Sequence, residues 1–412
     1  MRKLTFKHAL TPRGIATDCE ISFDEAGRIT AVGQGAGPYD GDFALPALGN
    51  AHSHAFQRAL AGHGEGRGGD DSFWRWREAM YALANRLDAD EMYTVARLAY
   101  SEMLAAGFTA VAEFHYLHHL KDGARGTAMA DAVIQAARDT GIRLRLLPVY
   151  YHAGGFGRPA GDAQRRFTHA SVDEFLKLVD SLAHAHLGIA IHSLRAVPLE
   201  HLKDIVAQRA GALFHVHVSE QQAEVDQCVA VYGKRPVELL ADTVELDANW
   251  TLVHATHADA SERASIRNAG ACVALCPLTE AYLGDGLFAA TEFHAQGGVL
   301  AIGTDSNARI DAIEELRWLE YGQRLRDQRR ARLADESGVG APLWQAAAAG
   351  GAHATGFAVG RIEVGAFADL VVLDESGAPW FGVEPARWLD AWLTGGSRHD
   401  IAHVYVGGKA VT

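Results

Sequence analysis

Cysteine is scarce in this sequence. Among 412 residues there are four cysteines, Cys19, Cys228, Cys272 and Cys276, and none belongs to a CxxC pair. A disulfide framework in a chain of this length would need more cysteines, so we expect free thiols and a reducing compartment. Cys272 and Cys276 lie in the apolar run ACVALCP, which favours buried thiols.

Long apolar runs and a surplus of positive charge are absent as well. No apolar run approaches the roughly 20 residues that a membrane helix requires. The basic residues at the start of the chain precede no apolar stretch, a pattern that argues against a secretory signal. The formal net charge is -13, and such a surface repels phosphate backbones and anionic membranes. We therefore expect a cytoplasmic protein that binds neither nucleic acids nor membranes.

The middle of the chain alternates apolar, strand-like segments with stretches of helical spacing. The eight predicted strands cover residues 43–52, 108–115, 143–150, 187–193, 212–218, 250–255, 270–276 and 297–305. Eight strand–helix units in this length are what a (β/α)8 barrel requires. We therefore predict an α/β fold with a TIM barrel over residues 48–357.

The two ends of the chain have a different character from the middle. Both contain short alternating strands separated by turns and glycines, such as CEISFDEAGRITAVG and HVYVGGKAVT. This similarity predicts one small composite domain, built from residues 1–47 and 358–412. The glycine-rich stretch Gly62–Ser72 follows the first barrel strand, and a mobile active-site loop and a solvated surface loop remain alternatives for it.

Polar side chains stand at the carboxyl ends of four predicted barrel strands, where a TIM barrel holds its active site. These groups are His52 and His54 on strand one, His215, His217 and Glu220 on strand five, His254 on strand six and Asp305 on strand eight. A single histidine on an apolar strand is usually a core residue, but burying so many unpaired polar groups would be costly. Together, imidazole and carboxylate groups favour a divalent ion such as Zn²⁺, with one position open for water.

These motifs resemble those of the amidohydrolase superfamily. GNAHSHAFQRALAG resembles its metal-binding first strand, and GRIEVGAFADLVVLD followed by VYVGGKAV resembles its closing β-sandwich. Within the superfamily the chain is similar to deiminases of histidine breakdown. The segments that carry this similarity are HSHAFQRALAG, FWRWREAMY, EFHYLHH, HSLRAVP, HVHVSEQQ, LVHATH and EELRWLEYGQRLR. The resemblance covers essentially the whole chain and implies a TIM barrel with a composite β-sandwich domain.

The resemblance implies a metal site and its ligands. The implied ligands of one Zn²⁺ per subunit are His52, His54, His217 and Asp305. His217 is chosen over His215 because it precedes Glu220 by three residues, and His215 is expected to pack one layer below. Binuclear relatives carry a lysine at the end of strand four, where this chain has none. Iron, manganese or nickel in place of zinc stays an alternative, since such ligand sets do not discriminate sharply.

The implied reaction is the hydrolysis of N-formimino-L-glutamate to N-formyl-L-glutamate and ammonia. Asp305 and His254 would accept the water proton and orient the attack, and Glu220 would protonate the departing nitrogen. Arginine binds carboxylates through its planar fork, so the expected anchors for a dicarboxylate substrate are Arg195 and Arg77. Gln57, Tyr116 and His192 are expected to complete the pocket.

Several positions leave alternatives open. Arg77 is only two residues from Arg75, and either arginine could be a surface residue packed on a neighbouring tryptophan. His118 and His119 are expected on a solvent-facing loop. Asn307 stands where many relatives have histidine, which puts the choice of substrate in question. The resemblance also implies a homodimer.

Two other functions compete with this interpretation. A mononuclear zinc deaminase of a purine, a pterin or another cyclic amidine would need aromatic walls for ring stacking and would have less use for two arginines. A barrel without catalysis, serving as a scaffold, would be expected to lack metal ligands. All ligand positions are filled here, so the arginine pair and the complete ligand set favour the dicarboxylate deiminase.

Overall fold

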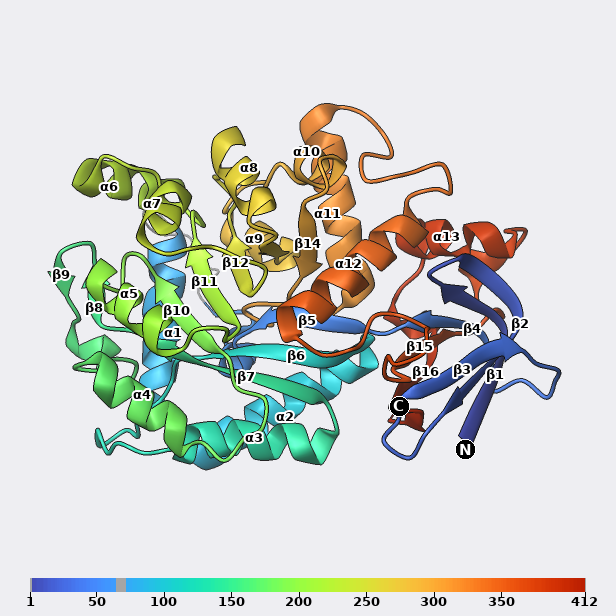
Figure 1. Cartoon of the computed structure of the whole chain (residues 1–412), viewed down its shortest axis with the longest axis horizontal. Coiled ribbons are helices and arrows are strands. Elements are labelled where there is room, and N and C mark those ends of the chain that lie inside the picture. The colour runs from blue at the N-terminus through green and yellow to red at the C-terminus, as the bar shows by residue number, and fades with distance from the viewer. Residues whose placement is uncertain (1, 64–71, 412) are drawn as a thin grey trace.

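Eight parallel strands form the centre of the larger lobe in the computed structural model, which describes residues 2–63 and 72–411 (Figure 1). Their spatial order follows the chain: β5 (Leu48–Ser53), β6 (Phe108–His115), β7 (Arg143–Tyr150), β10 (Ile189–Ser193), β11 (Phe214–Val218), β12 (Trp250–His254), β13 (Cys272–Leu275) and β14 (Val299–Ile302). An isolated bridge between Ser53 and Asp305 joins the two ends of this order. The predicted TIM barrel is confirmed.

Helices surround the barrel strands (Figure 1). They are α1 (Ser72–Arg86), α2 (Ala89–Ala105), α3 (Ala128–Thr140), α4 (Val172–Ser181), α5 (Leu199–Gln208), α6 (Gln222–Tyr232), α7 (Pro236–Thr243), α8 (Ala260–Asn268), α9 (Pro277–Leu283), α10 (Ala290–Ala295), α11 (Ala312–Asp327), α12 (Gly340–Thr355) and α13 (Trp388–Gly395). Helix α13 is an exception, because it lies between β15 (Leu370–Leu373) and β16 (Ile401–Val406) in the chain and packs against α11 and α12. Local sequence sets the ends of the helices. Asp88 caps α2 by accepting the backbone N–H of Glu91, and α3 ends at Gly141 in the left-handed conformation.

Strands from both ends of the chain build a second sheet of seven strands. In spatial order these are β17 (Lys409–Ala410), β16 (Ile401–Val406), β15 (Leu370–Leu373), β4 (Gly41–Pro46), β1 (Arg2–Thr11), β2 (Gly14–Phe23) and β3 (Ile29–Gln34). The pairing of β15 with β4 joins the late segment to the early one. A separate apolar core that includes Phe6, Ile21 and Leu370 belongs to this sheet. The composite β domain is thus confirmed, while its limits at 47/48 and 357/358 stay a prediction.

The predicted first barrel strand, residues 43–52, is in fact two strands. β4 ends at Pro46 and pairs with β1 and β15 in the seven-stranded sheet, whereas β5 begins at Leu48 and pairs with β6 in the barrel. Both segments are buried along their whole length from Phe43 onward, so a continuous apolar run conceals the change of sheet.

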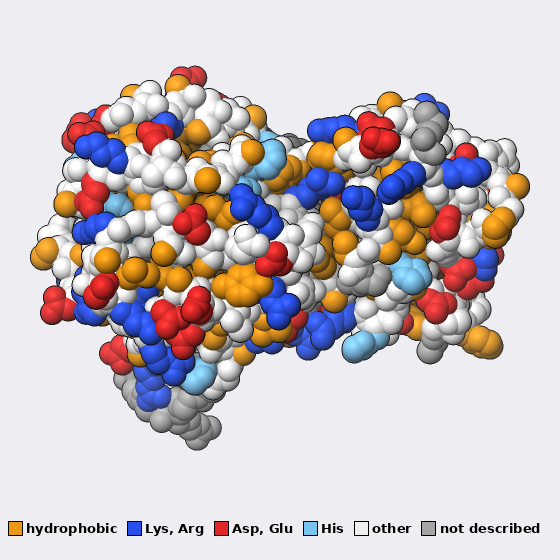
Figure 2. Space-filling view, turned by 90° about the horizontal axis from the view of Figure 1, so that it is seen from below, with side chains coloured by type: hydrophobic (Ala, Val, Ile, Leu, Met, Phe, Trp, Pro, Cys, Tyr) orange, Lys and Arg blue, Asp and Glu red, His pale blue; other side chains and the backbone are white. Residues whose placement is uncertain are grey.

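The thiols agree with the prediction from the composition. All four cysteines are buried and unpaired. None of the helices formed by residues 2–63 and 72–411 has both the length and the apolar character needed to cross a membrane. On the face shown in Figure 2, acidic and basic side chains are interspersed over two lobes of unequal size.

Helix α12 packs tightly against the amino-terminal ends of β5 and β14 through glycines. A Cβ added at Gly351 would lie 2.2 Å from the carbonyl oxygen of Gly49, and one at Gly350 would lie 1.9 Å from that of Leu300. The backbones touch there, so no flexible side chain can yield. The ring of Trp344, from the same helix, donates a hydrogen bond to the carbonyl of Pro46 at 2.9 Å.

Gly351→Ala is therefore expected to destabilise the fold. Overpacking of this kind costs about 1–3 kcal/mol in the free energy of unfolding, measured by urea denaturation. Gly395→Ala is the matched control, because a Cβ at Gly395 meets nothing within 4 Å. Equal stability of the two variants would show that the contact between α12 and β5 can relax.

Candidate metal centre and active site

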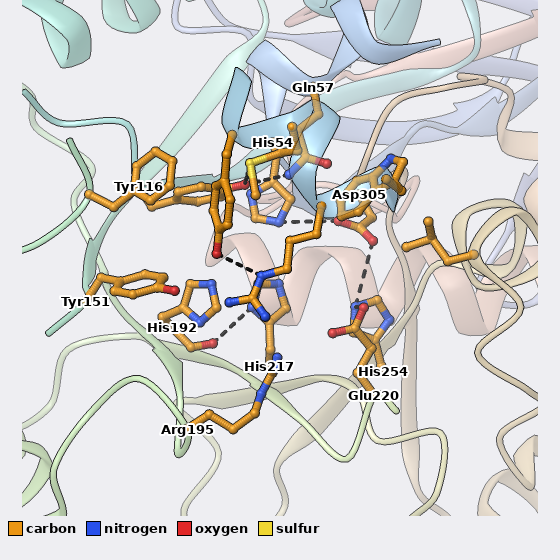
Figure 3. Close-up of a pocket in the computed structure, with 16 residues that line it drawn as sticks. His54, Gln57, Tyr116, Tyr151, His192, Arg195, His217, Glu220, His254 and Asp305 are labelled. Carbon is orange, nitrogen blue, oxygen red and sulfur yellow. Dashed lines mark hydrogen bonds and ion pairs between the residues drawn. The ribbon is translucent and has the colours of Figure 1, made fainter. Parts of the chain in front are cut away.

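The carboxyl ends of the barrel strands surround one pocket (Figure 3). His52 and His54 come from the end of β5, His217 from β11 and His254 from β12, while Asp305 follows β14. Figure 3 shows Arg195 and His192 on one side of His217, with Glu220 and His254 on the other. The pocket thus brings together side chains that lie more than 250 positions apart in the sequence.

Four side chains converge at this pocket: His54, His217 and Asp305 line it, and His52 contacts all three. Nε2 of His52 lies 3.1 Å from Nε2 of His54 and 3.1 Å from Nε2 of His217. Oδ1 of Asp305 lies 3.3 Å from Nε2 of both His52 and His54. All four residues are buried, and one atom from each faces a common centre. This group, His52, His54, His217 and Asp305, can hold a metal ion.

The donor chemistry fits a divalent cation. Nδ1 of His54 donates to the carbonyl of Phe114 at 2.9 Å, and Nδ1 of His217 donates to the carbonyl of His192 at 2.9 Å. With the proton held at Nδ1, a neutral ring presents its Nε2 lone pair to the centre. Burial lowers the pKa of His52, His54 and His217 and so favours the neutral form. Lone pairs that face one another this closely repel each other, and a cation bound between them removes this repulsion.

Metal binding should raise the melting temperature. An ion that binds only the folded chain stabilises it by about 4 kcal/mol when free Zn²⁺ is about 1,000 times its dissociation constant. Differential scanning fluorimetry of chelator-treated protein, with and without added Zn²⁺, measures the shift in Tm. The His52→Ala variant is the control and should respond weakly. An unchanged Tm of the unaltered protein would contradict a metal centre here.

Glu220 and His254 lie beside the four converging side chains. Nε2 of His254 is 4.0 Å from Oε1 of Glu220 and 3.7 Å from Oδ2 of Asp305. Nδ1 of His254 is 3.1 Å from Oε1 of Glu280. Burial disfavours the charged ring, but the hydrogen bond with Glu280 and the charges of Glu220 and Asp305 outweigh it and raise the pKa of His254 to about 10. Groups that can carry a proton therefore stand next to the metal-capable group.

The backbone is strained where it presents these side chains. The φ angles of Ser219, His254, Ala255 and Asp305 are 52°, 68°, 49° and 44°. L side chains rarely adopt this left-handed region, and such residues cluster at active sites. The ends of β11, β12 and β14 thus share a costly conformation that points to function.

The five residues predicted to bind substrate all line the pocket: Gln57, Arg77, Tyr116, His192 and Arg195. Nε2 of Gln57 donates to the hydroxyl of Tyr116 at 2.6 Å. Burial, followed by the charges of Arg195 and Arg77, lowers the pKa of His192. Of the two neighbouring arginines, Arg77 belongs to the pocket lining and Arg75 does not. Their roles toward a substrate stay predictions.

Other members of the site were not predicted from the sequence. Nε of Arg77 donates to the hydroxyl of Tyr81 at 2.7 Å, and Gln164 donates to the hydroxyls of Tyr81 at 3.1 Å and Tyr151 at 2.5 Å. Glu280 comes from α9. Tyr81, Gln164 and Glu280 do not stand at a strand end, so the rule that located the histidines could not find them, whereas Tyr151 directly follows β7 and the same rule could have found it.

Two expectations about histidines have different outcomes. His118 and His119 were expected on a solvent-facing loop, which is wrong: each is 3% exposed. The segment around Arg166 covers them, and its carbonyl accepts both of their backbone N–H groups at 3.1 Å. His215 lies below the metal-capable group, as expected, with Nε2 2.9 Å from the carbonyl oxygen of Ala354. The glycine-rich loop Gly62–Ser72 falls largely on residues 64–71, outside the described residues.

The fold and the converging donors define a TIM barrel with a metal-capable site. Residues 43–411 match the sequence model of the Amidohydrolase family, and the chain belongs to this family. The resemblance seen in the sequence is thereby confirmed.

Individual relatives sharpen the comparison. The chain is 44% identical over 429 residues to a protein of Pseudomonas aeruginosa named formimidoylglutamate deiminase, covering 100% of this chain and 94% of that protein. It is 29% identical to a 5-methylthioadenosine/S-adenosylhomocysteine deaminase of Natronomonas pharaonis, covering 99% and 92%. The crystal structure of an amidohydrolase from Brucella melitensis matches with a TM-score of 0.91 at 41% identity, covering 100% and 94%.

A zinc-containing structure shares the fold. An adenosine deaminase from Xanthomonas campestris with bound Zn matches with a TM-score of 0.80 at 23% identity, covering 99% of this chain and 92% of that one. At this identity the match concerns the fold alone.

Proposed function

We propose that the protein hydrolyses N-formimino-L-glutamate to N-formyl-L-glutamate and ammonia. The observation that carries this proposal is that Arg77 and Arg195 line the same pocket as Glu220, His254 and three members of the metal-capable group. Two guanidinium groups suit the two carboxylates of a glutamate derivative. The relative that is 44% identical is itself named a formimidoylglutamate deiminase, which supports the same substrate.

The metal that fits the proposal is one Zn²⁺ per subunit, held by His52, His54, His217 and Asp305. Three imidazoles and one carboxylate are a donor set that zinc accepts, and zinc would supply Lewis-acid chemistry that makes water nucleophilic near neutral pH. Zinc as the native metal, a single ion and a place in histidine breakdown are parts of the proposal, as are a homodimer and a cytoplasmic location.

The chain's own groups would move the protons. Water adds to the formimino carbon, and one of its protons passes to Oδ2 of Asp305. Nε2 of His254, 3.7 Å from this oxygen and protonated because its pKa is raised, orients the attack. Glu220, 4.0 Å from the same imidazole, gives a proton to the terminal nitrogen. The hydroxyl formed from the water then returns a proton to Glu220 as it becomes a carbonyl, and the proton held by Asp305 passes to the amine. The bond between carbon and that nitrogen breaks, ammonia leaves, and a formyl group remains on the glutamate.

The second candidate is a deaminase of a cyclic amidine, favoured by aromatic residues in the pocket. Trp76, Tyr81, Tyr116, Tyr151 and Phe167 line it together with the arginines. The tyrosine hydroxyls, however, bond to side chains: Tyr81 to Arg77, Tyr116 to Gln57 and Tyr151 to Gln164. These rings orient polar groups, and a neutral cyclic amidine carries no carboxylate for Arg77 or Arg195 to bind, so the diacid is the better fit.

A comparison of substrates tests the proposal. Ammonia release by zinc-loaded protein is measured with N-formimino-L-glutamate and with 5-methylthioadenosine at equal concentrations. We expect kcat/KM to favour N-formimino-L-glutamate by at least about 100-fold, because only this substrate pairs with both arginines. The reverse preference would establish the cyclic amidine deaminase.

A further inference from the structure

A buried network of polar side chains lies behind the metal-capable group, and Asn307 is at its centre. We propose that Asn307 is a positioning residue that fastens β5 to the loop after β14 and thereby holds three of the four proposed ligands, His52, His54 and Asp305, in place for the metal. The inference rests on the metal site of the proposed function and deepens it. In this proposal, Asn307 helps the site to keep its metal ion bound.

Asn307 makes contacts on both sides of the seam between β5 and β14. Its Nδ2 donates to the hydroxyl of Ser53 at 3.1 Å and to the backbone carbonyl of His54 at 3.0 Å. Its Oδ1 accepts the hydroxyl of Thr304 at 2.5 Å. The side chain is fully buried, so water does not compete for these bonds. The side-chain amide of Asn307 thus connects Thr304, which precedes Asp305, with Ser53 and His54.

The rest of the network repeats this connection. Asn50 donates to the hydroxyl of Thr304 at 2.7 Å, and its Oδ1 lies 3.2 Å from the backbone nitrogens of His52 and Thr304. The hydroxyl of Ser53 donates to Glu113 at 2.8 Å, and the same carboxylate accepts the backbone N–H of Ala55 at 2.6 Å. Every member touches the segment that carries His52 and His54 or the loop that carries Asp305.

The seam needs such support because regular strand pairing stops short of it. β14 ends at Ile302, before Asp305, and the chain continues to the ligand as a loop. The backbone nitrogens of Thr304 and Asp305 both donate to the carbonyl of His52 at 3.0 Å. A Cβ added at Gly303 would lie 2.8 Å from the backbone of His52, so the two segments are in direct contact. Small movements at this seam would therefore separate His52 and His54 from Asp305.

The backbone of the loop also requires a residue that tolerates positive φ. Asp305 has φ 44° and Asn307 has φ 56°, a conformation that side chains other than asparagine, aspartate and glycine adopt with difficulty. Residues held in this region persist when surrounding contacts fix them. Asn307 meets both demands, since its backbone accepts the turn and its amide fixes the neighbouring segments.

The test is the rate at which zinc leaves the folded protein. Zinc-loaded protein is mixed with an excess of a chromogenic chelator, and the release of zinc is followed by absorbance. Changes in the partners that orient metal ligands typically cost about 10–100-fold in metal affinity, so we expect Asn307→Ala to release zinc about 10–100 times faster. Asn307→Asp keeps the acceptor and loses both donated bonds, so it should also release zinc faster.

Asn307→Gly separates the backbone from the amide, because glycine adopts φ 56° without strain. Rapid zinc release from this variant supports the amide network, whereas release at the rate of the unaltered protein would reduce the role of Asn307 to its backbone. The control for a merely structural effect is Gln323→Ala on α11, which removes a buried amide that donates to the carbonyl of Phe288. That variant should lower Tm without changing zinc release.

The outcomes separate this inference from the proposed function. If the unaltered protein binds zinc and the three Asn307 variants release it at the same rate as that protein, the positioning role is wrong while the metal site stands. If the unaltered protein binds no zinc, the metal site itself is wrong. A loss of zinc retention shared equally by Gln323→Ala would assign the effect to general loosening and would overturn the specific role of Asn307.

Discussion

Glu220→Gln is expected to retain zinc and to lose most of its ammonia release. The substitution preserves the size of the side chain but removes the proton that Glu220 is proposed to give to the departing nitrogen. Positioned general acids and bases contribute about 10²–10⁴-fold to turnover, so kcat should fall by about that factor. Glu220 is outside the metal-capable group, so the zinc content, measured by elemental analysis, should not change.

The matched control for this variant is Glu262→Gln. Glu262 is also a buried glutamate, but it belongs to α8 and does not line the pocket. Its Oε2 lies 2.8 Å from Nε of Arg235. Its replacement should lower stability and leave the kcat of the folded fraction near that of the unaltered protein. Near-normal kcat of Glu220→Gln would refute the proton-transfer role, and loss of zinc from it would place Glu220 in the metal site.

Arg195→Met is expected to impair the use of the dicarboxylate substrate selectively. Loss of one partner from a buried charged contact costs about 2–5 kcal/mol, and 1.4 kcal/mol corresponds to a factor of ten. We therefore expect kcat/KM for N-formimino-L-glutamate to fall at least about 30-fold. Nε of Arg195 is buried and has no hydrogen-bond partner among the described residues, as expected of a side chain that awaits a ligand.

Selectivity is the decisive part of this result. The same variant should hydrolyse formamidine, a neutral substrate without carboxylates, at close to the original rate. Arg165→Met, which changes an exposed arginine outside the pocket lining, should affect neither substrate. An equal loss of Arg195→Met on both substrates would mean that Arg195 shapes the pocket and does not bind the carboxylate.

The barrel and its ligands could be predicted because two simple rules apply to them. Strands of a TIM barrel present functional side chains at their carboxyl ends, and the spacing of two places His52 and His54 on the same side of β5. The same rules hold for His217 and for Asp305. Predicted strands 108–115 and 143–150 coincide with β6 and β7, because each is a largely apolar segment that closely follows a glycine, Gly107 or Gly141.

The remaining features depend on contacts between distant parts of the chain. Glu280 reaches His254 from a helix, so no strand pattern marks it. The sequence around His118 and His119 shows neither strand nor helix periodicity, so it predicts a loop. The segment around Arg166, more than 45 positions later, nevertheless buries both side chains. The change of sheet between β4 and β5 is hidden in one apolar run. Long-range burial of this kind leaves no local trace in a single sequence.

The network of Asn307 shows the same limit within the site. Its departure from many relatives was visible in the sequence, but its partners Ser53 and His54 are 254 and 253 positions away. Only the closure of the barrel brings them together. The hydrogen-bond partners of Asn307 therefore could not be predicted from spacing in the sequence.

Product analysis is the most direct test of the central claim. Zinc-loaded protein is incubated with N-formimino-L-glutamate, and ammonia, N-formyl-L-glutamate, formamide and glutamate are quantified together. Ammonia and N-formyl-L-glutamate in equal amounts are the predicted result, because water replaces the terminal nitrogen. Formamide and glutamate would mean that the other carbon–nitrogen bond is cut and would contradict the account, and the absence of all four products from zinc-loaded protein would contradict the proposed substrate.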